Sequence, residues 1–536
     1  MEHLLIAGPI LLTLYYIYRR WTGISVADIP GPKADSFLLG SQVESFQSQA
    51  GETDFKWQAQ FGDVVRVKGV LGTDRLLVSD PKALHHIFTS GYNISKTGFR
   101  REITRLLTGP GLGWANGEDH LRQRKINSPA FGMAETRSYI PVYLAYANKL
   151  SAEWKERLGG DISTVVDAPH YFTRFFLDVI GEVAFDYQFG ATNNSNDRVA
   201  EVLSSVVPKF TTPTTFDILV LGLLELVPVP LLKAFTQYAP TKGLRNSRQV
   251  ERVATALAKR LVEEKAEALM AGKSKRDIMS LLVKANASAN PRSNLSADEL
   301  YAQMQTIMQA GHETTATTMS WTMLELTQHP EVQAKLREEI QATERAIYER
   351  GDTEFTAADF DSMTYTIAVM KETFRFHPVA FNTLREATRD ELLPLSKPIV
   401  TLSGKTITEL PIPKNQVLVI SIVGYNRNTD VFGKDAHQFN PERWLDGTVK
   451  PAANVGMYGN LMTFGSGHRG CIGWRFAVYE YQAFLIELVK NFEFSMDPTI
   501  VSKVRREAGI VMFPTIEGEV KKGPQLPITI RAVEQL

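Results

Sequence analysis

The sequence predicts a mainly α protein with a small β region, preceded by one N-terminal transmembrane helix. Residues 4–18 form an uncharged apolar run, which is typical of a membrane anchor. Residues 81–376 show a mostly helical pattern, whereas short alternating runs typical of strands occur only at 63–79 and 399–422. Since no compositional break follows residue 30, we expect one large domain after the anchor.

The apolar run at residues 4–18 (LLIAGPILLTLYYIY) admits two interpretations, an uncleaved anchor or a cleaved signal peptide. A helix of this length spans roughly 22 Å, short of the ~30 Å hydrocarbon core, so flanking residues must help or the bilayer must thin. A signal peptide would want positive charge before the run, but Glu2 precedes it and Arg19 and Arg20 follow it. These charges favour an anchor over residues 1–25, with residues 26–536 in the cytosol.

The overall composition excludes some classes of protein. Lys plus Arg and Asp plus Glu number 59 each, which gives no reason to expect a nucleic-acid partner. The chain has one cysteine, so an intrachain disulfide is excluded, as is any metal site that needs two thiolates from this chain.

The strand patterns lie at 63–68 (DVVRVK) and 75–79 (RLLVS), on either side of Gly72, and return between 399 and 422. We expect them to form a small sheet region near the N-terminal end of a large helical body.

One long helix begins at a capping box formed by Ser296 and Glu299 and ends before Pro330. Its length is about 50 Å, enough to cross a whole domain. Its middle reads AGHETT (310–315), with residue types that a merely stable helix would avoid. Gly311 would let another group come close, and a threonine hydroxyl can bond its own i−4 carbonyl. An acid beside an alcohol could pass protons, although a surface acid next to a helix-bending threonine is the alternative.

A second helix is expected over residues 361–376, with Glu372 and Arg375 on one face. Most such pairs are exposed and contribute little to stability. Arg443 follows in a PERW turn and could join the pair if the chain folds back.

Two further segments, around residues 120–124 and 210–235, can be interpreted as purely structural or as functional. His120 and Arg124 lie four residues apart on one helix face, where they could grip two carboxylates of a ligand or simply form a solvated face. The apolar, proline-punctuated stretch 210–235 is most simply buried core; the alternative is a surface that dips into a membrane and admits apolar substrates.

The single cysteine, Cys471, stands in the segment 464–473 (FGSGHRGCIG). Glycines let the backbone approach a bulky group, and Arg469 and His468 place charge or donors nearby. A cation or a helix N-terminus near the sulfur would favour the thiolate. A shielded thiolate is the ligand that a haem iron needs in order to push electron density toward dioxygen.

Together these segments, in this order, resemble the cytochrome P450 superfamily. Phe464, Gly467, Arg469, Cys471 and Gly473 fit its FxxGxRxCxG haem-binding pattern at every fixed position. AGHETT is similar to the oxygen-binding helix, ETFR to the ExxR motif and PERW to the family's turn. The chain departs from the family at His120, where tryptophan is usual. The resemblance covers the chain from the anchor to near the C-terminus, and the combined motifs look like those of microsomal, fungal-type monooxygenases.

The resemblance implies a role for each motif residue. Cys471 would be the axial ligand of the iron of haem b, and Phe464 would pack against its sulfur. Arg469, Arg124, His120 and Arg385 would pair with the haem propionates. Thr314 and Glu313 would hold water and relay protons during oxygen activation. Glu372, Arg375 and Arg443 would form a structural ion network behind the haem.

The implied reaction is monooxygenation of a hydrophobic small molecule, with electrons from NADPH delivered by a membrane-bound NADPH–cytochrome P450 reductase. That reductase would dock on the cysteine side, where Arg122, Lys125 and Arg475 are candidate contacts. The implied location is the endoplasmic reticulum membrane. Similarity to fungal enzymes of secondary metabolism leaves terpenoid, polyketide and aromatic substrates open. Candidate pocket residues by family position are Met304, Ile307, Met308, Val379, Phe381, Val511 and Met512.

Three alternatives compete with this interpretation. A nicotinamide oxidoreductase is suggested by the glycines at 465, 467 and 470, but the residues before them are a poor strand and too little chain follows. A haem sensor or carrier would have no use for the Glu313–Thr314 pair. A family member that rearranges an already oxygenated substrate often lacks that pair.

Overall fold

The computed structural model describes residues 23–193, 213–449 and 455–533, apart from 274, 289 and 291–293. The expected membrane helix at 4–18 therefore lies outside the described residues. Among the helices that are described, none is both long enough and apolar enough to cross a bilayer.

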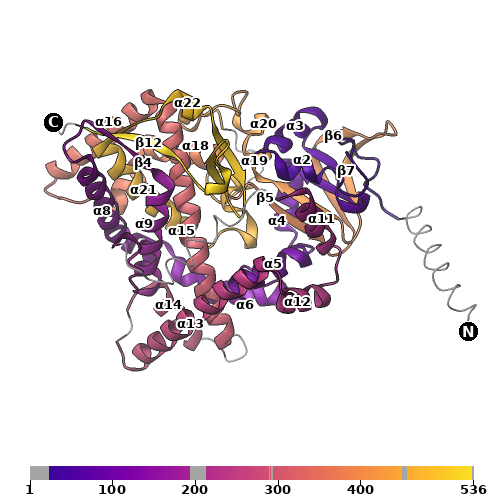
Figure 1. The fold of residues 1–536 in the computed structure, drawn as a ribbon, viewed down its shortest axis with the longest axis horizontal. Helices are drawn as coiled ribbons and strands as arrows, with labels where there is room; N and C mark the ends of the chain where they lie inside the picture. Colours follow the sequence, from indigo (N-terminus) through magenta and orange to yellow (C-terminus); the bar gives the residue numbers. More distant parts are fainter. Residues whose placement is uncertain are drawn as a thin grey trace, which may run out of the picture.

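Helices dominate the described chain, as expected from the sequence (Figure 1). The longer helices are α8 (Ile140–Leu158), α9 (Ala168–Phe185), α13 (Lys242–Met270), α15 (Ala297–Gln328), α16 (Pro330–Glu349), α18 (Thr364–Phe376) and α21 (Trp474–Asn491). The shorter ones are α2 (Gln42–Gln47), α3 (Glu52–Phe61), α4 (Pro81–Thr89), α5 (Gly98–Thr108), α6 (Gly117–Asn127), α7 (Met133–Ser138), α11 (Thr215–Leu224), α12 (Val229–Tyr238), α14 (Ile278–Ser288), α17 (Ala357–Ser362), α19 (Ile422–Asn426), α20 (Thr429–Phe432) and α22 (Pro498–Val501).

The strands form small sheets. They are β1 (Val64–Lys68), β2 (Asp74–Val78), β3 (Ile94–Ser95), β4 (Ser163–Asp167), β5 (Asn382–Ala387), β6 (Glu391–Val400), β7 (Thr406–Ile412), β8 (Val417–Ser421), β9 (Phe492–Ser495), β10 (Val504–Ala508), β11 (Met512–Ile516) and β12 (Pro527–Ala532). The largest sheet has the order β1-β2-β8-β5-β3, so the early strand pair joins the later strands, with β2 parallel to β8. The smaller sheets are β4-β12-β9, β6-β7 and β10-β11. The pairing of β9 to β12 near the C-terminus was not expected from the sequence.

Helix α15 is the central element of the helical part. In Figure 1 it runs between a group containing α8, α9, α16 and α21 and the sheet region with α2, α3, β6 and β7. The predicted capping box is present, because the Ser296 hydroxyl accepts from the Glu299 amide while the Glu299 carboxylate accepts from the Ser296 amide. These bonds satisfy amide donors that the first turn would otherwise leave without partners.

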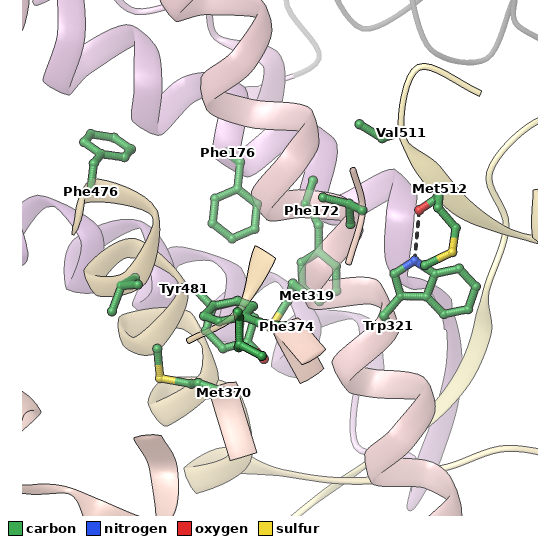
Figure 2. Close-up of a cluster of buried hydrophobic side chains, with 14 of the residues drawn as sticks. Phe172, Phe176, Met319, Trp321, Met370, Phe374, Phe476, Tyr481, Val511 and Met512 are labelled. Atoms are coloured by element: carbon green, nitrogen blue, oxygen red, sulfur yellow. Dashed lines mark hydrogen bonds between the residues drawn. The ribbon is translucent and has the colours of Figure 1, made fainter. Parts of the chain in front are cut away.

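The core around α15 is built from large apolar side chains of several helices. Figure 2 shows Phe172 and Phe176 of α9, Met319 and Trp321 of α15, Met370 and Phe374 of α18, and Phe476 and Tyr481 of α21 around one cluster. The Trp321 indole donates to the Met512 carbonyl at 3.0 Å, which ties α15 to β11. Gly311 permits the close contact with α9, since a Cβ there would lie 2.7 Å from Ile180. The group that Gly311 admits is therefore a neighbouring helix.

The apolar segment at 210–235 is not buried core where the structure describes it. Helices α11 and α12 bury Ile218 and Leu232, but they expose a set of large apolar side chains, Phe216, Leu223, Leu226, Val229, Leu231 and Phe235. The simpler interpretation from the sequence was wrong because the two short helices lie on the surface, so only one stripe of each faces the protein.

Candidate functional site

The segment 464–473 forms a tight loop that presents the Cys471 side chain. The Cys471 amide donates to the Phe464 carbonyl at 2.7 Å, which closes the loop just before α21 begins at Trp474. Gly467 has φ +58°, and a Cβ there would lie 2.2 Å from the Phe88 carbonyl oxygen, so only glycine fits. The loop geometry thus explains why the segment is rich in glycine.

Cys471 faces an interior surface. Burial raises the pKa of the Cys471 thiol, although the Gly473 amide and the Arg124 charge act to lower it. The Cys471 side chain is nevertheless accessible to solvent. A group that is both accessible and surrounded by protein lines a cavity and not the outer surface. Ala310 is likewise exposed in the middle of α15, between the buried Ile307 and Glu313.

Three arginines converge on this region from distant parts of the chain. Arg124 of α6 donates to the Gly470 carbonyl beside Cys471. Arg469 donates to the Ala115 carbonyl at 2.7 Å, and Arg385 of β5 donates to the Thr383 hydroxyl at 2.9 Å. Burial and neighbouring charges lower the pKa values of Arg385 and Arg469 to about 10.

Two further cations, which the sequence analysis did not single out, join this group. Burial, followed by the charges of Arg385 and Arg469, holds the pKa of Lys96 well below its usual range. Arg100 of α5 also contributes to the fields at Lys96 and Arg385. Within the described residues, no carboxylate lies within ion-pair distance of any of the five cations. No short motif marks Lys96 or Arg100, because the turn before α5 and the tertiary fold bring them here.

His120 is buried and held by an aromatic partner. Its Nδ1 lies 2.7 Å from the Tyr92 hydroxyl, and the Tyr92 ring lies 4.5 Å from that of His468. Burial and the charges of Arg469 and Arg124 lower the pKa of His120 to about 3, so the ring is neutral at pH 7. Tyr92 is a contact that the spacing of His120 and Arg124 did not reveal.

The acid and the alcohol in the middle of α15 lie about one helical turn after the exposed Ala310. The Thr314 hydroxyl donates to the Ala310 carbonyl at 2.8 Å, the i−4 bond expected from the sequence. Glu313 is buried, and its Oε1 lies 3.5 Å from Nε2 of His312, whose other ring nitrogen bonds the Met308 carbonyl.

The Glu372–Arg375–Arg443 network forms as the sequence suggested, and it is fully buried. Glu372 accepts from Arg375 at 2.7 and 2.8 Å and from Arg443 at 3.1 Å. The Trp444 indole also donates to Glu372, at 3.0 Å. All three charged side chains are 0% exposed, so this network is not one of the weak surface pairs.

The other candidate residues fall into different surroundings. Phe464 is half-buried and packs edge-on against Phe374 at 5.3 Å between ring centres. Lys125 is exposed, but Arg122 is bound by Glu299 at 2.5 Å, which reduces its availability to a partner. Arg475 is half-buried and stacks on Trp474.

The apolar pocket candidates do not all share one surface. Phe381 is half-buried, and the other six are buried: Met304, Ile307, Met308, Val379, Val511 and Met512. Met308 is two residues from Ala310 and therefore lies on nearly the opposite side of α15. Its place in the pocket stays a prediction from family position.

Comparisons with known proteins identify the class. The Cytochrome P450 family profile matches residues 30–521, so the chain belongs to the cytochrome P450 family. It is 34% identical to cytochrome P450 monooxygenase claP of Ampulloclitocybe clavipes, over 94% of this chain and 93% of that protein. It is 31% identical to cytochrome P450 monooxygenase 205 of Postia placenta, over 94% and 92% of the two chains. The chain is therefore a cytochrome P450 monooxygenase.

Membership of the family implies a haem whose iron is held by a cysteine thiolate. The residues present fit that group. The accessible Cys471 has Arg124 beside it, and the neighbouring cations have no carboxylate partners among the described residues. A haem would bring the two carboxylates that these cations lack.

Proposed function

We propose that this protein inserts one oxygen atom from O2 into a hydrophobic small molecule, with electrons from NADPH supplied by NADPH–cytochrome P450 reductase. The reaction belongs to fungal secondary metabolism, and terpenoids are among the candidate substrates. Similarity to fungal monooxygenases supports this part of the proposal. The observation that carries the proposal is that Cys471 is accessible yet surrounded by protein and lies beside Arg124 and Arg469, neither of which has a carboxylate partner among the described residues.

In this proposal residues 26–536 form the catalytic domain, and Cys471, the only cysteine of the chain, is the iron ligand. The Gly473 amide near the sulfur and the start of α21 favour the thiolate. Phe464 covers the sulfur side of the loop, and Gly467 lets the loop pass close to Phe88. When bound, the haem supplies the activation of dioxygen, which no protein side chain provides.

Arg124, Arg385 and Arg469 would hold the propionates of the haem through charge-assisted hydrogen bonds. His120 takes part as a neutral donor. With the Tyr92 hydroxyl donating to Nδ1, the ring proton sits on Nε2, where it can be given to an anion. The Nε2–H of His120 can therefore donate the hydrogen bond that the tryptophan indole N–H, usual in the family, would donate.

Thr314 and Glu313 hold and move protons on the α15 side of the pocket. The Thr314 hydroxyl can turn from the Ala310 carbonyl to a water and pass on a proton. The Glu313 carboxylate, one residue away, can take a proton from solvent water and return it to that water. Glu372, Arg375 and Arg443 take no part in proton transfer, because they are sealed in the protein.

We further propose that the chain is held at the endoplasmic reticulum membrane by residues 1–25, with the catalytic domain on the cytosolic side. The apolar side chains exposed on α11 and α12 support a membrane-facing surface. The exposed Phe37 and Leu38 lie near it in the fold, since α2 contacts α11. The reductase would use the opposite, cysteine side, where Lys125 is free to make contact.

Thr314→Ala tests the proton-delivery role. In a system reconstituted with NADPH and the reductase, we expect product formed per NADPH to fall about tenfold or more, with the lost electrons recovered as hydrogen peroxide. Thr318→Ala is a matched control, because Thr318 makes the same i−4 bond one turn later, at 2.7 Å to Thr314. Equal coupling in wild type and Thr314→Ala would contradict the role of Thr314.

A further inference from the structure

Arg100 is a cation on the interior surface that no protein group neutralises. Its side chain is exposed, yet burial lowers the pKa of its guanidinium, the same combination that places Cys471 inside the molecule. Within the described chain, no carboxylate pairs with it. Arg105, one turn later on α5, shows the contrast, since Glu102 binds it at 2.6 Å.

The face of α5 that bears Arg100 looks toward α15. Thr104 lies one turn after Arg100, and a Cβ on Gly113 would lie 3.3 Å from the Thr104 methyl and 3.9 Å from that of Thr306. Thr306 in turn lies one turn before the exposed Ala310. Arg100 and Ala310 therefore border the same interior space from two helices.

The number of cations exceeds what the haem can neutralise. The four guanidinium groups of Arg100, Arg124, Arg385 and Arg469 have no carboxylate partner among the described residues, whereas a haem brings two carboxylates. Arg124 and Arg469 lie by the Cys471 loop and Tyr92. Arg124, Arg385 and Arg469 each donate a side-chain hydrogen bond to a polar protein atom. The Arg100 side chain makes no such bond to the described residues. A charge surrounded by protein and without a partner is costly, so a further anion is expected beside Arg100.

We propose that Arg100 binds a carboxylate of the substrate, so that the substrate is a hydrophobic carboxylic acid with its apolar body against α15. This inference rests on the proposed monooxygenase function and narrows its substrate class. The guanidinium edge suits a carboxylate, since two parallel N–H donors meet two oxygens. A carboxylate held at α5 would fix which carbon of the apolar body lies near Ala310 and Thr314.

The test measures binding and not turnover. Purified full-length haem protein is titrated at pH 7.5 with three acids and their methyl esters: dodecanoic, 4-phenylbutanoic and dehydroabietic acid. Equilibrium dialysis and the change in the haem absorption spectrum report the binding. For at least one pair we expect wild type to prefer the acid by about tenfold to a hundredfold. Arg100→Gln should reduce that preference below about threefold, whereas Arg100→Lys should keep part of it.

Arg276→Gln is the control, because Arg276 is an exposed arginine far along the chain whose partner is Glu135. A wild type that prefers none of the three acids over its ester would overturn the inference, as would a preference that survives Arg100→Gln. A fall in haem content in Arg100→Gln would also overturn it, because Arg100 would then serve the haem. A carbon monoxide spectrum of the same wild-type preparation separates the two proposals: without a thiolate-haem band the proposed function itself fails.

Discussion

Two groups of buried arginines in this protein differ in what surrounds them. Arg375 and Arg443 share Glu372 and further backbone carbonyls, so their charges are satisfied by the chain itself. Arg124, Arg385 and Arg469 reach carbonyls, a hydroxyl and an amide oxygen, but no carboxylate among the described residues. The first group can hold the fold without help, whereas the second is built to receive an anion. Burial alone therefore does not tell a structural arginine from a binding one; the partners do.

The largest effect is expected from Glu372→Ala. Removing the carboxylate leaves Arg375 buried without a counter-charge and leaves Arg443 with Asp435 alone, which costs about 3–5 kcal/mol of folding free energy. We expect little folded protein, as judged by soluble yield and thermal unfolding followed by circular dichroism. Glu442→Ala is the neighbouring control, because Glu442 makes an exposed pair with Lys335 and its loss should cost less than about 1 kcal/mol. Similar stability of the two variants would remove the contrast on which the comparison depends.

Arg385→Leu, in contrast to Glu372→Ala, should weaken haem binding and leave the fold intact. The fold should survive, because the substitution removes a desolvated cation, but haem should leave about tenfold to a hundredfold faster, since one charge-assisted contact to a propionate is lost. Haem transfer to excess apomyoglobin measures the rate. Arg389→Leu is the control, because Arg389 is an exposed arginine four residues later that pairs with Glu391. If Arg385→Leu unfolds the protein and Arg389→Leu does not, then the second group of arginines is structural after all.

Glu299, a paired carboxylate at the start of α15, should show a stability effect of intermediate size. Burial opposes ionisation of Glu299, but hydrogen bonds from Arg122, Ser296 and Gln123 lower its pKa to about 2. A lowered pKa gives stability that is present above the unfolded-state value near 4.3 and is lost only as the pH falls toward 2. Glu299→Gln should therefore lower the free energy of unfolding by about 1.5 kcal/mol. This loss should be the same at every pH between 5 and 8.

Hydrogen exchange in the first turn of α15 measures the effect of Glu299→Gln. Asp298→Asn is the control on the same turn, since Asp298 is exposed. A cost that changes between pH 5 and 8 would show that another group titrates with this network.

The smallest effect is expected at Glu480, which is a buried carboxylate with no cation beside it. Neither of its carboxylate oxygens has a hydrogen-bond partner within the described chain, and burial raises the pKa of Glu480 well above the usual range. A raised pKa gives stability that is present at low pH and is lost as the pH rises. Glu480→Gln should therefore raise the melting temperature by about 2 °C at pH 8 and by less at pH 5.5. A lower melting temperature at pH 8 would indicate an ionised Glu480 with an unrecognised partner.

Local rules predicted the parts of the structure that local physics determines. The capping box of α15, the Thr314 bond to Ala310 and the strand pair β1–β2 follow from spacing and residue type. The family motifs placed Glu372, Arg375 and Arg443 together, as observed. Lys96, Arg100 and Tyr92 could not be found in this way, because their neighbours are brought in by α5, α6 and β5 from distant parts of the chain.

One error shows the same limit. The stretch at 210–235 reads as core, but its described helices expose one face, because hydrophobicity does not reveal on which side the protein lies. The composition was correct, and the direction of the side chains was decided by tertiary packing.

The account's central claim is that Cys471 binds haem iron as a thiolate. A carbon monoxide difference spectrum of the dithionite-reduced membrane fraction, for wild type and Cys471→Ser, tests it most directly. The account predicts a strongly red-shifted Soret band in the wild type that is absent from Cys471→Ser. A wild-type band at the position typical of histidine-ligated haem, or well-folded wild-type protein that contains no haem, would contradict it.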